Sequence, residues 1–200
     1  MVKLILVRHA LTVDNQENRL SGHIDSSVSE KGKEQIDKIT HYLKDFKIDN
    51  IYTTTSTRTK DTVKELAKLK SIDIKEKENL KEISFGDFEG LTFNDIKANH
   101  PEEFQDMIRK GYEYKYPNGE SLIDSYNRVC EELNQIIEQS NNQTVLICSH
   151  GGTIRNIITY LISNSYNYHW NFKIDNGSVT LLEVDNGFTV ITMMNNTSFI

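Results

Sequence analysis

Two short apolar stretches of this chain each run directly into a histidine. Leu4–Val7 is followed by Arg8 and His9, and Val145–Cys148 leads to His150 and a Gly-Gly turn. Apolar, β-branched runs of this length are typical of strands that a parallel sheet buries on both faces. In an open α/β sheet the carboxyl ends of the strands face one crevice, where ligands bind. The pattern therefore predicts an α/β sheet that brings two imidazoles into one crevice.

The groups expected in that crevice suit a phosphate. Imidazole and guanidinium groups donate hydrogen bonds to phosphate oxygens, and a helix that opens at Gly151-Gly152 adds backbone N–H groups. The spacing of histidines and cysteines is not that of a metal site, and carboxylates are not clustered. We therefore expect phosphate chemistry that uses no metal and no other cofactor.

Strand patterns alternate with helix patterns, which predicts a three-layer α/β/α sandwich with a mostly parallel sheet. Asn186-Gly187 indicates a closing hairpin, which makes the sheet mixed. A single domain is expected over residues 1–200, with a weakly ordered cap excursion over about 77–120. The expected strands are 2–7, 50–54, 72–76, 144–149, 177–184 and 188–194, and the expected helices begin at or just after Ser29, Ser56, Pro101, Ser121 and Gly152.

Composition and charge restrict the kinds of molecule that the chain is expected to bind. The formal net charge of −6 argues against a general nucleic-acid surface. No apolar run reaches the roughly 18 residues of a membrane span, and the N-terminus shows no signal-peptide pattern, so cytoplasmic residence is expected. Cys130 and Cys148 fall in core patterns and are expected to be reduced. The expected partner is a small phosphorylated metabolite, and an exposed edge at the third strand would allow a homodimer.

Five ordered blocks carry a resemblance to a known family. They are Arg8-His9 with Thr12, Asn15, Arg19, Gly22 and Asp25 before Ser29-Glu30-Lys31-Gly32; Arg58 with Thr62; Glu82 with Gly86 and Glu89-Gly90; Gly119-Glu120-Ser121; and Ser149-His150-Gly151-Gly152. In this order, over nearly the whole chain, they resemble the histidine phosphatase superfamily, which includes the cofactor-dependent phosphoglycerate mutases. The resemblance implies a phosphoglycerate mutase-like fold and a metal-independent phosphomonoesterase.

The resemblance also implies roles for individual side chains. His9 would be the nucleophile that carries a transient phosphohistidine, and Glu82 the general acid that protonates the leaving oxygen. Arg8, Arg58 and His150 would hold the phosphate oxygens, each arginine as a two-pronged fork. Glu78, Glu89 and Glu120 compete with Glu82 for the acid role. The further phosphate- and substrate-binding candidates are Thr12, Asn15, Ser21, Gly22, Gly151, Tyr112 and Tyr114.

The chain departs from the family pattern beside the nucleophile. Ala10 stands where glycine usually follows the histidine, and Leu11 stands where glutamate is frequent. If the backbone at Ala10 had a positive φ, the alanine would be strained by about 1 kcal/mol. The stretch before Arg58 lacks the usual Ser-Pro. These changes touch substrate approach and loop shape rather than the charged groups.

Two local stretches resemble α-ribazole phosphatases of the cobalamin nucleotide-loop pathway: Ser21-Gly22-His23 and residues 169–177. This makes α-ribazole 5′-phosphate the favoured substrate, with cap aromatics such as Tyr112 and Tyr114 stacking on its flat base. Trp170 is expected in a core cluster with Phe172. The alternatives are a broad-specificity or sugar-phosphate phosphatase, a phosphoglycerate mutase, which the chain length disfavours, and an inactive phosphate-binding or interaction module.

Overall fold

The computed structural model describes all residues 1–200, and it contains one six-stranded sheet with the strand order β3-β2-β4-β1-β5-β6. Neighbouring strands are parallel from β3 to β1, whereas β5 and β6 run antiparallel to their neighbours. The predicted mostly parallel, mixed sheet is confirmed. The strands are β1 (Val2–Arg8), β2 (Asn50–Thr53), β3 (Ile74–Glu76), β4 (Thr144–Ser149), β5 (Val179–Asp185) and β6 (Phe188–Asn196).

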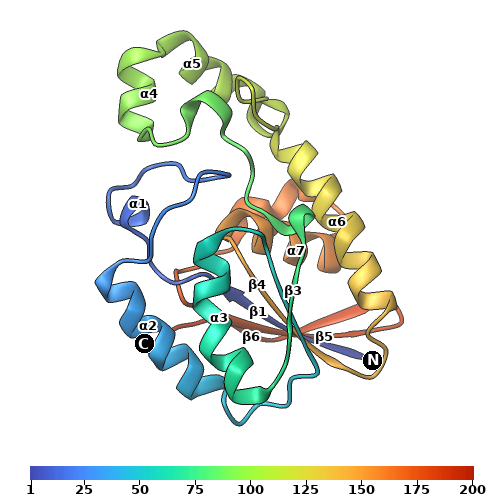
Figure 1. The fold of residues 1–200 in the computed structure, drawn as a ribbon. Helices are drawn as coiled ribbons and strands as arrows, with labels where there is room; N and C mark the ends of the chain where they lie inside the picture. Colours follow the sequence, from blue (N-terminus) through green and yellow to red (C-terminus); the bar gives the residue numbers. More distant parts are fainter.

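Helices cover both faces of the sheet, as Figure 1 shows. One face carries α2 (Glu30–Leu43) and α3 (Thr57–Lys70), and the other carries α6 (Leu122–Glu138) and α7 (Gly151–Ser163). Successive residues of a strand point to opposite faces. In β1, Leu4 therefore packs in the core beneath α6 and α7, while its neighbour Ile5 packs in the core beneath α2 and α3. This alternation produces the predicted three layers.

Local hydrogen bonds fix where the helices begin. The Ser29 hydroxyl accepts from the backbone N–H of Gly32 at the start of α2, and Ser121 forms a capping box with Asp124 at the start of α6. Helix α3 also begins just after a serine, Ser56, as predicted, but that side chain makes no capping bond to the helix. The Thr54 hydroxyl instead accepts the N–H of Ser56, so the chain enters α3 through a turn held from the preceding strand.

The cap excursion is ordered, which corrects the expectation of weak order over residues 77–120. It contains two α-helices, which Figure 1 shows standing above the sheet, and three short 3₁₀ turns. Three of its side chains, Phe88, Ile96 and Tyr114, form a small buried core together with Leu20 of the loop after β1. They come from separate short segments, so no single periodic stripe marks this core in the sequence. The helical elements of the excursion are α4 (Phe93–Asn99), α5 (Pro101–Lys110), η1 (Glu78–Leu80), η2 (Gly86–Phe88) and η3 (Gly111–Glu113).

The predicted closing hairpin is confirmed. Asn186 and Gly187 both have positive φ, of 47° and 80°, as a two-residue hairpin turn requires. Cys130 and Cys148 are buried and unpaired. The longest helices fall short, in length and apolar character, of what crossing a bilayer takes. Two short helices complete the fold, α1 (Val13–Gln16) in the loop after β1 and the 3₁₀ helix η4 (Tyr166–Asn171) after α7.

Candidate active site

The two histidines meet because their strands are neighbours. β1 and β4 pair in parallel with Arg8 opposite Ser149, and the N–H of His9 extends the pairing by bonding the carbonyl of Ser149. His9 and His150 therefore leave the sheet side by side, with ring centroids 5.2 Å apart and edge to face. Both side chains are buried at the carboxyl end of the sheet. The two imidazoles thus lie next to each other at the ends of neighbouring strands, the proximity that the sequence predicts.

The proton on His9 sits on Nδ1. This atom lies 2.8 Å from the carbonyl oxygen of Ala10, and because a carbonyl only accepts hydrogen bonds, Nδ1 is the donor. Burial, and then the charges of Arg58 and Arg8, lower the pKa of His9 well below its usual 6.5, so the ring is neutral. A neutral ring with its proton on Nδ1 has a lone pair on Nε2. His9 is thus in the form that a nucleophile needs.

The strain considered for Ala10 does not arise. Its φ is not positive, and both of its backbone polar groups are bonded. The Ala10 N–H donates to the hydroxyl of Thr62 at 2.9 Å, while its carbonyl holds His9. The Thr62 hydroxyl in turn donates to the carbonyl of Arg58. Alanine therefore fits here, and its carbonyl serves to orient the neighbouring imidazole.

His150 has the opposite tautomer, and a chain of hydroxyl groups fixes it. The Thr59 hydroxyl donates to the carbonyl of Ser56, so it accepts from the hydroxyl of Thr54. With its own proton used, Thr54 can only accept from His150 Nε2, 3.2 Å away. On the other side of the ring, Nδ1 accepts from Arg58 Nε at 3.3 Å. His150 therefore presents an N–H at Nε2, although burial lowers the pKa of the ring well below 6.5 and keeps it uncharged.

Arg58 is buried, and most of its donors are already used within the chain. Besides Nε, which bonds His150, Nη1 donates to the carbonyl of Ile24, and Nη2 donates to the carbonyls of Ser21 and Gly22. One of its five N–H groups remains. The two-pronged fork expected for Arg58 is therefore not available in this arrangement. The residue instead ties the loop after β1 to the second histidine.

Arg8 does keep a fork free. Only Nη1 is bonded, to the carbonyl of Ile174 at 2.7 Å, while the adjacent Nε and Nη2 have no partner in the chain. Nε is also buried, and a buried donor without a partner costs free energy unless a ligand supplies the acceptor. A side chain on Gly151 would lie 3.4 Å from the Arg8 guanidinium carbon, so glycine at this helix start leaves the approach open.

Glu82 faces the same crevice from the segment after η1. Its Oε2 accepts from the N–H of Gly152 at 2.9 Å, and Oε1 accepts from the N–H of Ile83 at 3.1 Å. A Cβ at position 152 would displace this carboxylate, so glycine at the second position of the Gly-Gly turn lets Glu82 keep its bond to the start of α7. Glu82 and its partner Gly152 also line a neighbouring pocket.

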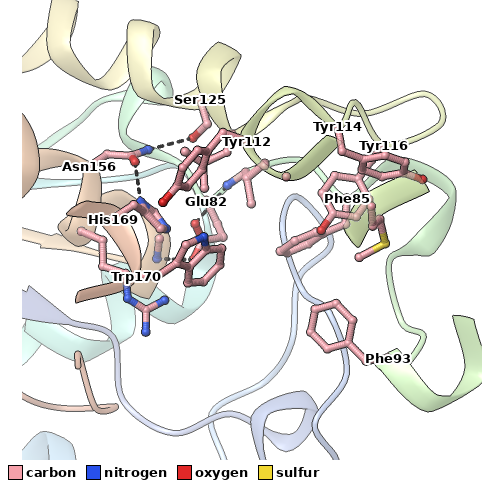
Figure 2. A pocket seen from close by; sticks show the side chains of 16 residues that line it. Glu82, Phe85, Phe93, Tyr112, Tyr114, Tyr116, Ser125, Asn156, His169 and Trp170 are labelled. Atoms are coloured by element: carbon pink, nitrogen blue, oxygen red, sulfur yellow. Dashed lines mark hydrogen bonds between the residues drawn. The ribbon is translucent and has the colours of Figure 1, made fainter. Parts of the chain in front are cut away.

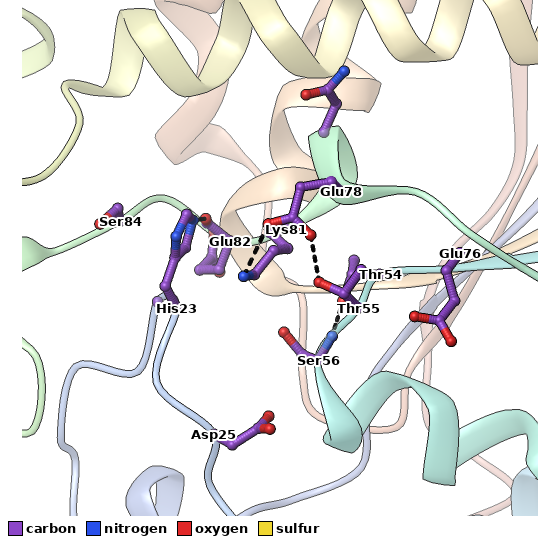
Figure 3. Close-up of polar contacts among 12 residues, drawn as sticks. His23, Asp25, Thr54, Thr55, Ser56, Glu76, Glu78, Lys81, Glu82 and Ser84 are labelled. Atoms are coloured by element: carbon purple, nitrogen blue, oxygen red, sulfur yellow. Dashed lines mark hydrogen bonds and ion pairs between the residues drawn. The ribbon is translucent and has the colours of Figure 1, made fainter.

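The three rival carboxylates have structural partners instead. Glu89 accepts the N–H groups of His23, Ile24 and Phe85, and Glu120 pairs with Arg128 and with the N–H of Ser84. Figure 3 shows Glu78 turned toward Thr55 and Lys81, and its hydrogen bond to Thr55 lowers the pKa of Glu78. Of the four glutamates, only Glu82 lines the pocket.

Four of the remaining candidates hold the loop after β1 together. Thr12 is buried and forms a capping box with Asn15, and the Ser21 hydroxyl donates to Asp14. Gly22 offers its carbonyl to Arg58. Asn176 donates to the Asn15 oxygen at 2.8 Å, which leaves the Asn15 amide N–H groups free. Within this set only Asn15 keeps side-chain N–H donors without a partner in the chain, and the rest shape the loop.

A cavity of about 310 Å³ opens beside Glu82, beneath the cap. Tyr112 and Tyr114 line it, as predicted, although Tyr114 is also part of the cap core. Trp170 lines it too and is 65% exposed, so its expected place in a core cluster is wrong. Trp170 and the adjacent His169 both belong to the 3₁₀ turn η4, which buries the side chain of His169 and exposes that of Trp170. Figure 2 shows the aromatic side chains of Phe85, Phe93, Tyr112, Tyr116 and Trp170 around the cavity, and Met107 also lines it.

Sequence reasoning gave no role in this pocket to four polar side chains, Ser125, Arg155, Asn156 and His169. The guanidinium of Arg155 lies 5.4 Å from the centre of the Trp170 ring, and its Nε donates to the carbonyl of Phe172. Arg155 follows Gly151 by four positions in α7, which places both on one face of the helix. That spacing was a signal available in the sequence, and His169 opens the stretch over residues 169–177 that resembles α-ribazole phosphatases, although the resemblance gave it no role of its own.

Buried neutral histidines predict a specific loss of stability in acid. The unfolded chain binds a proton at each histidine below pH 6.5, but His9, His150 and His169 stay neutral in the fold, with the pKa of His169 lowered to about 3 by burial and then by Arg155. Stability is therefore present above pH 6.5 and is lost as pH falls. We expect urea unfolding to show a loss of about 1.3 kcal/mol per histidine between pH 7.5 and 5.5. In His169→Phe that loss should shrink by about a third, and an unchanged loss would contradict the assignment.

Comparison with known proteins agrees with this geometry. The model of the histidine phosphatase superfamily (branch 1) matches residues 4–197. Phosphoserine phosphatase 1 of Hydrogenobacter thermophilus is 32% identical over 195 residues, which is 98% of this chain and 92% of that protein. The structure of Bacillus stearothermophilus YhfR has a TM-score of 0.90 at 29% identity, covering 100% of this chain and 99% of that one. The α-ribazole phosphatase of Shigella flexneri has a similar fold, with a TM-score of 0.92, 24% identity and coverage of 97% and 96%.

Proposed function

As the chain belongs to the histidine phosphatase superfamily (branch 1) and is a phosphatase of that family, we propose that it hydrolyses a small phosphate monoester through a phosphohistidine on His9. The observation that carries this proposal is the pair of opposite tautomers. His9 offers a lone pair at Nε2, while His150 offers an N–H at Nε2. One ring can attack phosphorus while the other donates to a phosphoryl oxygen, and neither needs to change its protonation state first.

In the first step His9 Nε2 forms a bond to phosphorus and the ester P–O bond breaks. The unbonded Nε and Nη2 of Arg8 match two phosphoryl oxygens. The N–H at His150 Nε2 leaves the Thr54 hydroxyl and donates to the third oxygen. Glu82 gives its proton to the departing oxygen. In the second step a water attacks the phosphohistidine, Glu82 takes up the proton of that water, and inorganic phosphate leaves with His9 restored.

The cavity beside Glu82 supports α-ribazole 5′-phosphate as the substrate, within the assembly of the cobalamin nucleotide loop. Apolar and aromatic side chains make up most of its lining, and the rings of Trp170 and Tyr112 are available to stack on a flat apolar base. Contacts remote from the phosphate improve orientation as well as affinity, so they raise kcat/KM. Burying such a base would contribute a few kcal/mol, which is roughly a hundredfold in specificity.

One observation favours a second candidate, phosphoserine. Arg155 lines the cavity with its two Nη groups unbonded, so it can pair with a carboxylate beyond the phosphate. The Hydrogenobacter relative named phosphoserine phosphatase 1 is 32% identical. A phosphoglycerate would use the same arginine, so these acids form one class that competes with the flat base.

A panel of phosphate esters tests the proposal. We expect kcat/KM for α-ribazole 5′-phosphate to exceed that for ribose 5-phosphate by roughly a hundredfold, and both Trp170→Ala and Tyr112→Ala to reduce this ratio. Phosphoserine and 3-phosphoglycerate complete the panel. A higher kcat/KM for phosphoserine than for α-ribazole 5′-phosphate would make phosphoserine the favoured substrate and leave the proposed mechanism unchanged. Failure to hydrolyse any ester in the panel would contradict the proposal and favour the alternative of an inactive phosphate-binding module.

Replacing Glu82 with glutamine should slow hydrolysis most for esters with poor leaving groups. An aryl phosphate hardly needs a proton on its departing oxygen, whereas an alkyl ester does. We expect kcat to fall about 10²-fold for ribose 5-phosphate and much less for nitrophenyl phosphate. Glu120→Gln is the matched control, because that carboxylate is bound to Arg128. Equal losses for both esters would assign Glu82 a positioning role. Burst kinetics should accompany the test, because slow hydrolysis of the phosphohistidine masks the first step.

Activity should not depend on a divalent metal. Arg8 and Arg58 supply the positive charge at the phosphate site, and no three histidine, cysteine or carboxylate side chains come together as metal ligands. We expect full activity after dialysis against EDTA, and inhibition by vanadate, which mimics five-coordinate phosphorus. Loss of turnover in EDTA followed by recovery with Mg²⁺ or Zn²⁺ would contradict the proposed mechanism.

A further inference from the structure

One wall of the cavity carries a hydrogen-bonded chain that the phosphate chemistry does not use. It links Ser125 of α6, Asn156 of α7 and His169 of η4, and all three side chains are buried. Asn156 Nδ2 donates to the Ser125 hydroxyl at 3.3 Å, and Asn156 Oδ1 lies 2.8 Å from His169 Nδ1 (Figure 2). Three separate elements thus hold one imidazole in a fixed orientation against the substrate cavity.

The chain fixes the proton of His169 as well as its position. An amide oxygen only accepts hydrogen bonds, so Nδ1 is the donor and carries the single proton of the ring. Burial and the charge of Arg155 keep the ring neutral. Nε2 therefore has a lone pair and no hydrogen. A nitrogen in this state accepts a hydrogen bond and cannot donate one.

Nε2 of His169 has no hydrogen-bond partner within the chain. It is not among the polar atoms that protein encloses without a partner, and the residue lines the cavity beside Trp170 and Arg155. The acceptor therefore meets whatever occupies the cavity. A site with a fixed polar group discriminates strongly against ligands that leave the group unpaired.

We propose that His169 Nε2 accepts a hydrogen bond from the part of the substrate beyond the phosphate, and that the enzyme thereby selects esters with an O–H or N–H donor there. This inference rests on the proposed function, and it makes His169 a specificity residue rather than a catalytic one. Two sources supply that donor: the ribose hydroxyls of α-ribazole 5′-phosphate and the ammonium group of phosphoserine. A phosphate ester whose remaining part is wholly apolar would leave Nε2 unpaired.

Two matched pairs of substrates test the inference and distinguish the sources. The first is α-ribazole 5′-phosphate with its 2′,3′-dideoxy form, and the second is phosphoserine with 3-phosphooxypropionate, which lacks the amino group. In the unmodified enzyme we expect kcat/KM to fall about 10- to 100-fold on removal of the donor in one of these pairs. In His169→Phe, which keeps a flat ring without an acceptor, that ratio should fall to about one.

Ratios near one for both pairs in the unmodified enzyme would overturn the inference, and so would a ratio that survives in His169→Phe. If that variant does not fold, Asn156→Leu answers the same question, because without the amide oxygen the ring proton is no longer held on Nδ1 and the ratio should fall. Phenyl phosphate distinguishes failure of the proposed phosphatase function from failure of the role inferred for His169. If the unmodified enzyme does not hydrolyse it or the panel esters, the proposed function fails; if it does, a lack of donor selectivity counts against His169 alone.

Discussion

His9→Ala is expected to lower kcat by about 10⁴-fold or more, because the variant has no atom that can take the phosphoryl group. Arg8 and His150 would still bind the ester, so KM should change far less than kcat. Rapid acid-free quenching of the unmodified enzyme with ³²P-labelled substrate should trap one acid-labile phosphate per chain. Mass spectrometry should place it on His9, and the variant should trap none.

A histidine elsewhere in the chain supplies the control. His41 lies on the exposed side of α2, so His41→Ala should retain full turnover and full trapping. Circular dichroism would establish that His9→Ala keeps the fold. Near-normal activity in a folded His9→Ala variant would rule out a covalent mechanism through His9. Phosphate trapped on His150 would show that His150 is the nucleophile instead.

Arg58→Lys is expected to damage stability and activity together. Arg58 bonds the carbonyls of Ser21, Gly22 and Ile24 in a buried setting, and one ammonium group cannot reproduce that geometry. Two carbonyls would lose their donors at roughly 1–2 kcal/mol each, so the free energy of unfolding should fall by about 3 kcal/mol. His150 would also lose the donor at Nδ1 that fixes its tautomer, and we expect kcat/KM to fall about 10³-fold.

Urea unfolding and steady-state kinetics measure the two effects separately. Arg109→Lys is the matched control, because Arg109 is exposed and pairs only with Asp106 on the surface of α5, so both quantities should stay unchanged. If Arg58→Lys lost activity without losing stability, Arg58 would act on the phosphate directly. If stability fell while kcat/KM held, its bond to His150 would have no role in the reaction.

Much of this architecture follows from local sequence. The alternation of Leu4 and Ile5 between the two cores, the caps at Ser29 and Ser121, and the Asn-Gly hairpin each depend on side chains within a few residues. Hydrophobic periodicity, helix capping and turn formation depend on residues close together in the chain, so they can be predicted from a single sequence. The placement of two histidines at strand ends follows from the same short-range pattern together with the direction of parallel strands.

The ordered blocks of residues also determined that the site would hold Arg8, His9, Arg58, Glu82 and His150 together. They did not determine what each donor does. Arg8 and Arg58 have the same side chain, yet one keeps a free fork and the other spends four of its five N–H groups within the chain. The difference depends on carbonyl groups brought in by distant loops, such as Ile174, which lies 166 residues from Arg8.

The substrate side of the site was decided by tertiary structure alone. The cap is ordered because side chains from several short segments share a small core, and no single segment displays the period of that core. Trp170 and His169 are adjacent in sequence, but the turn of η4 exposes the first and buries the second. The proton on His169 is set by Asn156, which another element supplies. Hydrophobic periodicity records which face of an element is buried, whereas the direction of a hydrogen bond is fixed only when separate elements are packed against one another.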